Sequence, residues 1–156
     1  MGYELKATIF KLYIISGGLY GFGPPGPYAS TEYIYPDGSK SPGPDLPETR
    51  YGHCAATLVD ERVIIMGGEV NGDSRKSNTV IIYDPKTMTF QTSFNMIYPR
   101  TFFGCALMRS PMHGNRSVIL AVGGDEEFKN GAYIGKSTAE IFDYTNPDSN
   151  GWEEGM

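Results

Sequence analysis

Three short apolar runs, each closed by two glycines, constrain this chain of 156 residues more than any other feature. The glycine pairs are Gly17 and Gly18, Gly67 and Gly68, and Gly123 and Gly124. They recur at intervals of roughly 50 residues, a period typical of solenoids and β-propellers. The sequence therefore predicts a repeat architecture in which similar units stack on one another.

Each glycine pair is followed by further features in the same order. First comes a polar loop, then a strand-like run with an aromatic near its end, as in 30–35, 79–83 and 137–142. A second aromatic follows in two of the repeats, and a proline–arginine segment at Pro47–Arg50 and Pro99–Arg100 leads into small and apolar residues. This agreement makes chance repetition of the glycine pair a poor explanation.

The runs within each repeat favour β-strands. They are short, rich in β-branched and aromatic residues, and bounded by Gly, Pro, Asn or Asp. No amphipathic helical stretch of useful length is present. Four short strands in roughly 50 residues match one blade of a β-propeller, so the predicted fold class is all-β.

The complete pattern resembles the kelch repeat. The features that carry the resemblance are the double glycine, Tyr83-Asp84-Pro85, the aromatic Phe90 and the following Pro-Arg. The resemblance implies a partial kelch-type propeller with four-stranded antiparallel blades. The residues that form the structural motif are then the six glycines named above together with Tyr83, Phe90, Phe142 and Trp152, whose rings are expected to lie between adjacent blades.

The whole chain, 1–156, is expected to be a single incomplete propeller. Its approximate blades are 3–48, 49–98 and 99–156, with the last strand of the third blade truncated. Propellers typically close with about four to eight blades. We therefore expect a fragment that is completed by remaining propeller blades, with a scaffold shared between chains as an alternative.

Kelch-type propellers commonly bind proteins through the loops of one face, so the resemblance implies a protein-interaction module and no enzyme. Exposed aromatics and arginines are frequent interface anchors. The candidate partner-binding residues are Tyr20, Phe22, Tyr28, Arg50, Arg75, Tyr98, Arg100 and Tyr133. Arg50 and Arg100 suit a carboxylate-bearing peptide, and the alternative is a structural role in which they bond loop carbonyls.

Other classes of function find less support in the sequence. The net charge of −5 gives no basic surface for nucleic acid. The alternative function is a propeller enzyme such as a galactose oxidase-like copper oxidase, but only two histidines are present and neither lies in a ligand cluster. No catalytic trio, metal site or cofactor site is predicted.

The two cysteines, Cys54 and Cys105, occupy near-equivalent positions in successive repeats and could approach one another. We expect them to be buried, reduced thiols that act as small apolar side chains. No run approaches the roughly 18 apolar residues of a membrane span. A cytoplasmic location is the expectation.

Overall fold

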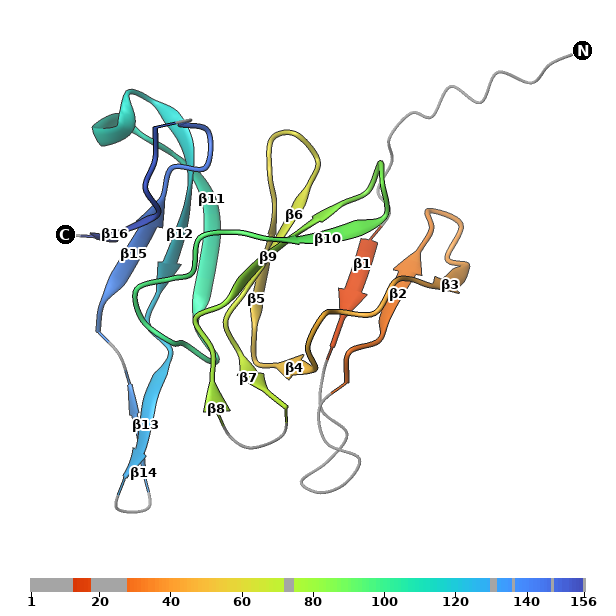
Figure 1. Cartoon of the computed structure of the whole chain (residues 1–156), viewed down its shortest axis with the longest axis horizontal. Helices are drawn as coiled ribbons and strands as arrows, with labels where there is room; N and C mark the ends of the chain where they lie inside the picture. The colour runs from red at the N-terminus through yellow and green to blue at the C-terminus, as the bar shows by residue number, and fades with distance from the viewer. Residues whose placement is uncertain are drawn as a thin grey trace, which may run out of the picture.

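The computed structural model describes residues 13–17, 28–71, 75–129, 132–135, 137–146 and 148–155. These residues form β-strands joined by turns, with one short 3-10 turn, η1 (Pro111–His113). Three sheets stand side by side along the molecule in chain order (Figure 1). The all-β prediction is therefore confirmed, and the sheets do not close into a ring.

The three sheets are repeats of one antiparallel pattern, and we call them blades 1, 2 and 3. Blade 1 has the order β1-β2-β3: β1 (Tyr13–Ser16), β2 (Thr31–Ile34) and β3 (Lys40–Pro42). Blade 2 has the order β5-β6-β9-β10: β5 (Cys54–Thr57), β6 (Val63–Met66), β9 (Val80–Asp84) and β10 (Thr89–Thr92). Blade 3 has the order β11-β12-β15-β16: β11 (Gly104–Ser110), β12 (Arg116–Val122), β15 (Ala139–Phe142) and β16 (Trp152–Gly155). The predicted blade limits stay a prediction, since residues 1–12 lie outside the described residues.

One hydrogen bond recurs in all three blades and fixes which residues are equivalent. The first glycine of each pair donates its N–H to a carbonyl that precedes the next strand: Gly17 to Ser30 (3.1 Å), Gly67 to Thr79 (3.0 Å) and Gly123 to Thr138 (3.1 Å). Counting from these bonds, Glu32, Ile81 and Glu140 are equivalent, and so are Ile34, Tyr83 and Phe142.

This register differs from the sequence interpretation in blade 1. The pattern aligns Tyr35 with Tyr83, whereas the strand pairing places Ile34 there and leaves Tyr35 exposed. Tyr33 is the buried tyrosine instead, and its hydroxyl hydrogen-bonds the hydroxyl of Tyr83 across the junction of blades 1 and 2. A one-residue shift in a strand exchanges the two faces, so alignment of single letters misassigns the inward ring.

The described glycines of the motif need their lack of a side chain. Gly67 and Gly68 have φ of 62° and 91°, in the left-handed region where a Cβ is unfavourable. A Cβ on Gly67 would lie 2.6 Å from the carbonyl oxygen of Arg100. The Pro-Arg segment entering blade 3 therefore packs directly on the backbone of blade 2.

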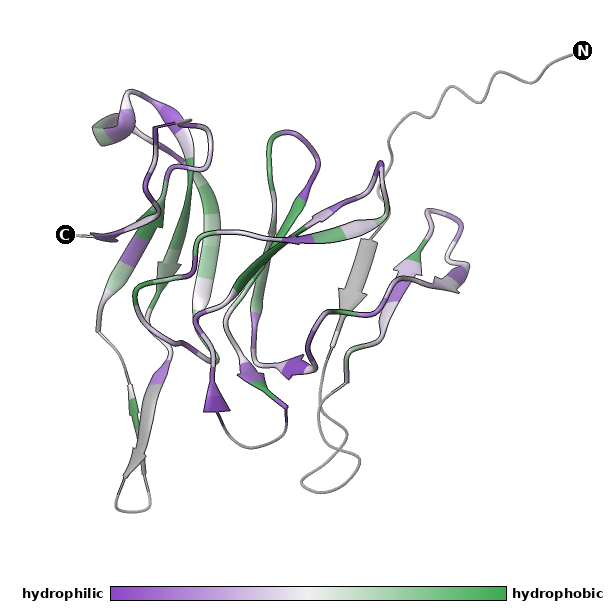
Figure 2. Ribbon diagram, in the orientation of Figure 1, coloured by the Kyte–Doolittle hydropathy of each residue, from purple (hydrophilic) through white to green (hydrophobic). Residues whose placement is uncertain are grey.

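Blade 2 has a hydrophobic cluster on each face, which explains why β6 is apolar throughout rather than alternating. The cluster facing blade 3 is the larger one: Leu58, Ile64, Met66, Val80, Met96, Phe103, Ile119, Ala121, Phe142 and Trp152. The cluster facing blade 1 is built on Leu46, Ile65 and Ile81. Figure 2 shows the hydrophobic residues gathered on the strands of blades 2 and 3.

The motif aromatics form pairs inside their own blades. The rings of Tyr83 and Phe90 lie 5.1 Å apart, and those of Phe142 and Trp152 are stacked at 5.4 Å. Trp152 also donates its Nε1–H to the carbonyl of Phe94 (2.9 Å), in the segment that leaves blade 2. The aromatic pair of blade 3 thus holds the chain that connects the two blades.

The cysteines correct the expectation of free thiols. Cys54 in β5 and Cys105 in β11 form a disulfide, with their Cα atoms 6.1 Å apart. These are the first strands of blades 2 and 3, which contact each other directly. Counted from the buried arginines, Cys54 matches Gly104, so Cys105 lies one residue further along its strand. This offset turns both side chains toward the hydrophobic cluster between the two blades, at a Cα separation that a disulfide needs.

Candidate partner-binding face

Short strands extend from the glycine-bearing ends of the blades and form one edge of the molecule, which we call the loop face. They are β4 (Arg50–Tyr51), β7 (Glu69–Val70) and β8 (Arg75–Lys76), joined in one sheet, and the hairpin of β13 (Asp125–Lys129) and β14 (Ala132–Gly135). Figure 1 shows both groups projecting from the same end, opposite η1 and the turn between β5 and β6. The sequence predicts plain loops here, and the structure replaces them with small sheets.

The predicted binding residues are distributed unevenly over this region. Tyr28 is 39% exposed, Arg75 is exposed in β8, and Tyr133 belongs to β14. Tyr98 is half-buried, and its hydroxyl donates to the carboxylate of Glu154 in β16. Tyr20 and Phe22 lie outside the described residues.

Arg100 is fully buried and holds blade 3 together. Its Nη1 donates to the carbonyl oxygens of Gly123 (2.7 Å) and Thr138 (2.9 Å), and its Nη2 donates to Oγ1 of Thr138 (2.9 Å). Its Nε donates to a carboxylate oxygen of Glu140 (2.8 Å), and both side chains are 0% exposed. The guanidinium therefore faces its own blade and not the surface.

Arg50 repeats this arrangement in blade 2. Its Nη1 donates to the carbonyl of Gly67 (2.9 Å) and its Nη2 to Oγ1 of Thr79 (3.1 Å), while the residue is 1% exposed. The structure thus corrects the prediction that Arg50 and Arg100 anchor a partner, since the Pro-Arg segment turns each guanidinium inward onto glycine-loop carbonyls. The inference of a carboxylate-bearing peptide loses its support for the same reason.

The loop face also presents a residue that the sequence analysis does not single out. Phe102 is 60% exposed and has φ of 51°, in the left-handed region. Counted from the buried arginines, it is equivalent to Gly52, whose φ is 63°. The N–H of Phe102 donates to the carbonyl of Gly52 (2.8 Å), and its ring meets Tyr51 edge-on at 6.0 Å. Aligning the repeats on arginine, rather than on glycine pairs, reveals this exchange of glycine for phenylalanine.

His53 lies between β4 and β5, immediately before Cys54. Burial, assisted by the charge of Arg50, lowers the pKa of His53 to about 4. The imidazole is therefore neutral at neutral pH. A histidine whose pKa is lower in the folded than in the unfolded protein makes the folded state less stable as the pH falls, because the unfolded chain binds the proton more readily.

We expect His53 to make the protein less stable as pH falls from about 6.5 toward 4. The unfolded chain takes up the proton first, near its ordinary pKa of 6.5, so stability is fully present above that pH. Between pH 7 and 5 the loss amounts to about 2 kcal/mol. Denaturant unfolding of wild-type and His53→Gln proteins at both pH values measures it.

The control for this prediction is His113, at the far end of the molecule beside Glu153 (3.6 Å). The His53→Gln variant should lose most of the difference between pH 7 and 5, and His113→Gln should retain it. An equal pH dependence in wild type and His53→Gln would show that His53 is not the group responsible.

Metal and membrane chemistry find no support in the part of the chain that the structure describes. Within it, no three His, Cys, Asp or Glu side chains gather as ligands for a metal ion. Among the same residues, no helix has the length and hydrophobicity to cross a membrane.

Consecutive antiparallel sheets of one repeated pattern, two of them with four strands and a buried arginine, define a repeat protein of the β-propeller class. Residues 50–91 match the family model of the Kelch motif. The chain carries a kelch motif there, and its three antiparallel sheets have the arrangement of a partial β-propeller. No curated protein matches the chain.

Proposed function

We propose that this chain is a protein-binding module and that its partner docks on the loop face around Phe102. Kelch repeats generally serve protein interaction, which supports the class of function. The observation that carries the docking site is an exposed aromatic ring in a backbone conformation that favours glycine. Together with Tyr28 (39% exposed) and Ile134 (42% exposed), Phe102 gives this edge an apolar character.

The strain at Phe102 supports a functional role rather than a structural one. A left-handed conformation costs a residue with a Cβ roughly 1–2 kcal/mol. Burial of the ring offsets little of this free-energy cost, because most of the side chain is exposed. Backbone strain of this kind concentrates at ligand-binding sites, and exposed aromatics are frequent hot spots of protein interfaces.

The test is the variant Phe102→Gly, which should weaken partner binding without lowering the stability of the fold. Glycine occupies the equivalent position in blade 2, so the free energy of unfolding should stay within about 1 kcal/mol of wild type or rise. Binding should weaken by roughly 30-fold, the effect of losing an aromatic hot spot of about 2 kcal/mol. Thermal unfolding and quantitative affinity enrichment of proteins from cell extract measure the two effects.

Met112→Ala is the matched control, because Met112 is 71% exposed and lies in η1 at the opposite end. Proteins that bind the loop face should be retained by Met112→Ala and lost with Phe102→Gly. Retention of the same proteins by both variants, with both folded, would contradict the proposed site.

A further inference from the structure

The hairpin of β11 and β12 carries a motif that the proposed binding function does not use. Asn115-Arg116-Ser117 has the form Asn-X-Ser/Thr, in which X is any residue except proline, and the sequence contains no second triplet of this form. Such a triplet is the acceptor for asparagine-linked glycosylation when it lies on the surface of a secreted protein. Triplets of this form also arise by chance, so the surroundings of Asn115 decide what this one can do.

The triplet lies in an extension of blade 3 that blade 2 lacks. In blade 2 the first hairpin ends at the pair of Thr57 and Val63. The hairpin of blade 3 continues three pairs beyond the equivalent point, as far as Ser110 and Arg116. This extension and η1 project from the end of the molecule opposite the loop face (Figure 1). The four-stranded blade does not need these residues, since blade 2 forms without counterparts of them.

The side chain of Asn115 is available for modification. Asn115 is exposed, as are its neighbours Gly114 and Arg116. Its backbone holds the turn, because its N–H donates to the carbonyl of Ser110 (2.9 Å) and its own carbonyl accepts from Nη1 of Arg109 (3.3 Å). Within the part of the chain that the structure describes, its side-chain amide makes no hydrogen bond. A substituent on Nδ2 can therefore extend into solvent without breaking a contact of the fold.

The conformation of the turn explains the asparagine of the triplet but not the serine. Asn115 has φ of 63°, in the left-handed region that asparagine adopts more readily than most residues. Ser117 is half-buried in β12 and pairs with Arg109. Its hydroxyl makes no hydrogen bond with any other described residue. The fold thus gives no reason for a hydroxyl two residues after Asn115, whereas asparagine-linked glycosylation requires one.

The disulfide of Cys54 and Cys105 is a second observation that favours this modification. Disulfides form and persist in oxidising compartments such as the lumen of the endoplasmic reticulum, and they are rare in the cytosol. Oligosaccharides are transferred to asparagine in that same lumen. The disulfide and the triplet are independent features, because the sulfurs lie against the hydrophobic cluster between blades 2 and 3 whereas Asn115 lies at an exposed tip. Both features favour the same compartment.

We propose that Asn115 is an N-glycosylation site and that the protein enters the secretory pathway, in place of the cytoplasmic location that the sequence predicts. The co-reactant is an oligosaccharide linked to a lipid diphosphate. A bond forms between the anomeric carbon of its first sugar and Nδ2 of Asn115, and the bond from that carbon to the diphosphate oxygen breaks. The amide loses one proton, and the lipid diphosphate leaves. The glycan lies at the end opposite Phe102, so it leaves the loop face open to a partner.

The experiment is peptide mapping of the full-length protein purified from the cells that produce it. Trypsin cleaves after Arg109 and Arg116 and releases residues 110–116, which contain Asn115. We expect this peptide to be absent at its unmodified mass. Treatment with peptide-N-glycosidase should restore it with aspartate at position 115, and in heavy-oxygen water the new carboxylate should carry the label. Recovery of the peptide with unmodified Asn115, in the same yield as the other peptides of the protein, would overturn the proposal.

Variants expressed in the same cells test the triplet itself. Asn115→Gln and Ser117→Ala should each abolish the mobility shift that peptide-N-glycosidase removes, and Ser117→Thr should retain it. Asn150→Gln is the matched control, because Asn150 is exposed but is followed by Gly151 and Trp152 and forms no triplet. The oligosaccharide is transferred before folding is complete, so the result does not depend on the stability of each variant. A shift that persists in Ser117→Ala, or that is lost in Asn150→Gln, would contradict the proposed site.

Discussion

Glu140→Ala is expected to lower the free energy of unfolding by about 3–5 kcal/mol, the cost of removing one partner from a buried ion pair. Glu140 and Arg100 are both fully buried, and their bond is 2.8 Å long. The substitution would leave the charge of Arg100 without its carboxylate. It would also remove the acceptor of the Ile97 and Tyr98 N–H groups, which hold the segment that connects blades 2 and 3.

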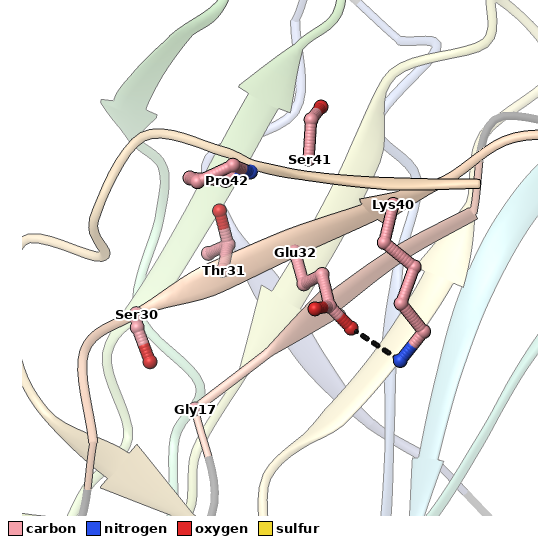
Figure 3. A pocket seen from close by; sticks show the side chains of 7 residues that line it. All are labelled: Gly17, Ser30, Thr31, Glu32, Lys40, Ser41 and Pro42. Atoms are coloured by element: carbon pink, nitrogen blue, oxygen red, sulfur yellow. Dashed lines mark hydrogen bonds and ion pairs between the residues drawn. The ribbon is translucent and has the colours of Figure 1, made fainter.

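The structure provides a matched control for this substitution. Glu32→Ala removes the same side chain at the equivalent position of blade 1, where the carboxylate is 44% exposed and pairs with Lys40 (Figure 3). An exposed ion pair is worth roughly 0–1 kcal/mol. Urea unfolding of the two variants should therefore give midpoints that differ strongly, with Glu140→Ala the less stable. Similar midpoints would show that the buried pair does not stabilise the junction of blades 2 and 3.

The blades were accessible from sequence because their signals are local. The positive φ of Gly67 and Gly68 requires glycine, and the double glycine marks the end of a strand in every repeat. Tyr83 and Phe90 pair across adjacent strands, and one turn sets the six residues between them. Each of these features depends on residues within one blade, so the repeat in the sequence predicts the repeat in the structure.

The two arginines show what local sequence patterns cannot predict. In the sequence Arg50 lies three residues after Pro47 and Arg100 directly follows Pro99, positions that suit either an exposed anchor or a buried ligand of carbonyls. The decision rests on Gly67 and Gly123, which lie 17 and 23 residues further along the chain. A distance in space set by strand pairing cannot be read from spacing in the chain.

The sequence did not predict Phe102 as a binding residue for a different reason. The glycine pairs and the aromatics define the repeat, and Phe102 belongs to neither set. Its strain becomes apparent only when its backbone is compared with that of Gly52 in the preceding blade. A residue that departs from the local rule of its repeat is the kind of position where function competes with stability.

The disulfide provides the second large prediction. Replacing Cys54 and Cys105 by serine should lower the free energy of unfolding by about 4 kcal/mol, because the bond closes a loop across a sequence separation of 51 residues. The same loss should follow reduction of the wild-type protein. The bond joins β5 to β11, so its removal should weaken the junction of blades 2 and 3 while each sheet keeps its internal pairing.

The measurement is thermal unfolding with and without a thiol reductant, together with alkylation of the native protein. Wild type should resist alkylation and unfold at lower temperature once reduced, whereas the double-serine variant should not respond to reductant. Alkylation of both cysteines after denaturation without reductant would show that they are free thiols, as the sequence predicts. The cytoplasmic location stays a prediction, and the bond weighs against it, because disulfides persist in oxidising compartments and are rare in the cytosol. If the double-serine variant matches wild type in stability, the hydrophobic cluster between the blades holds the junction without the covalent link.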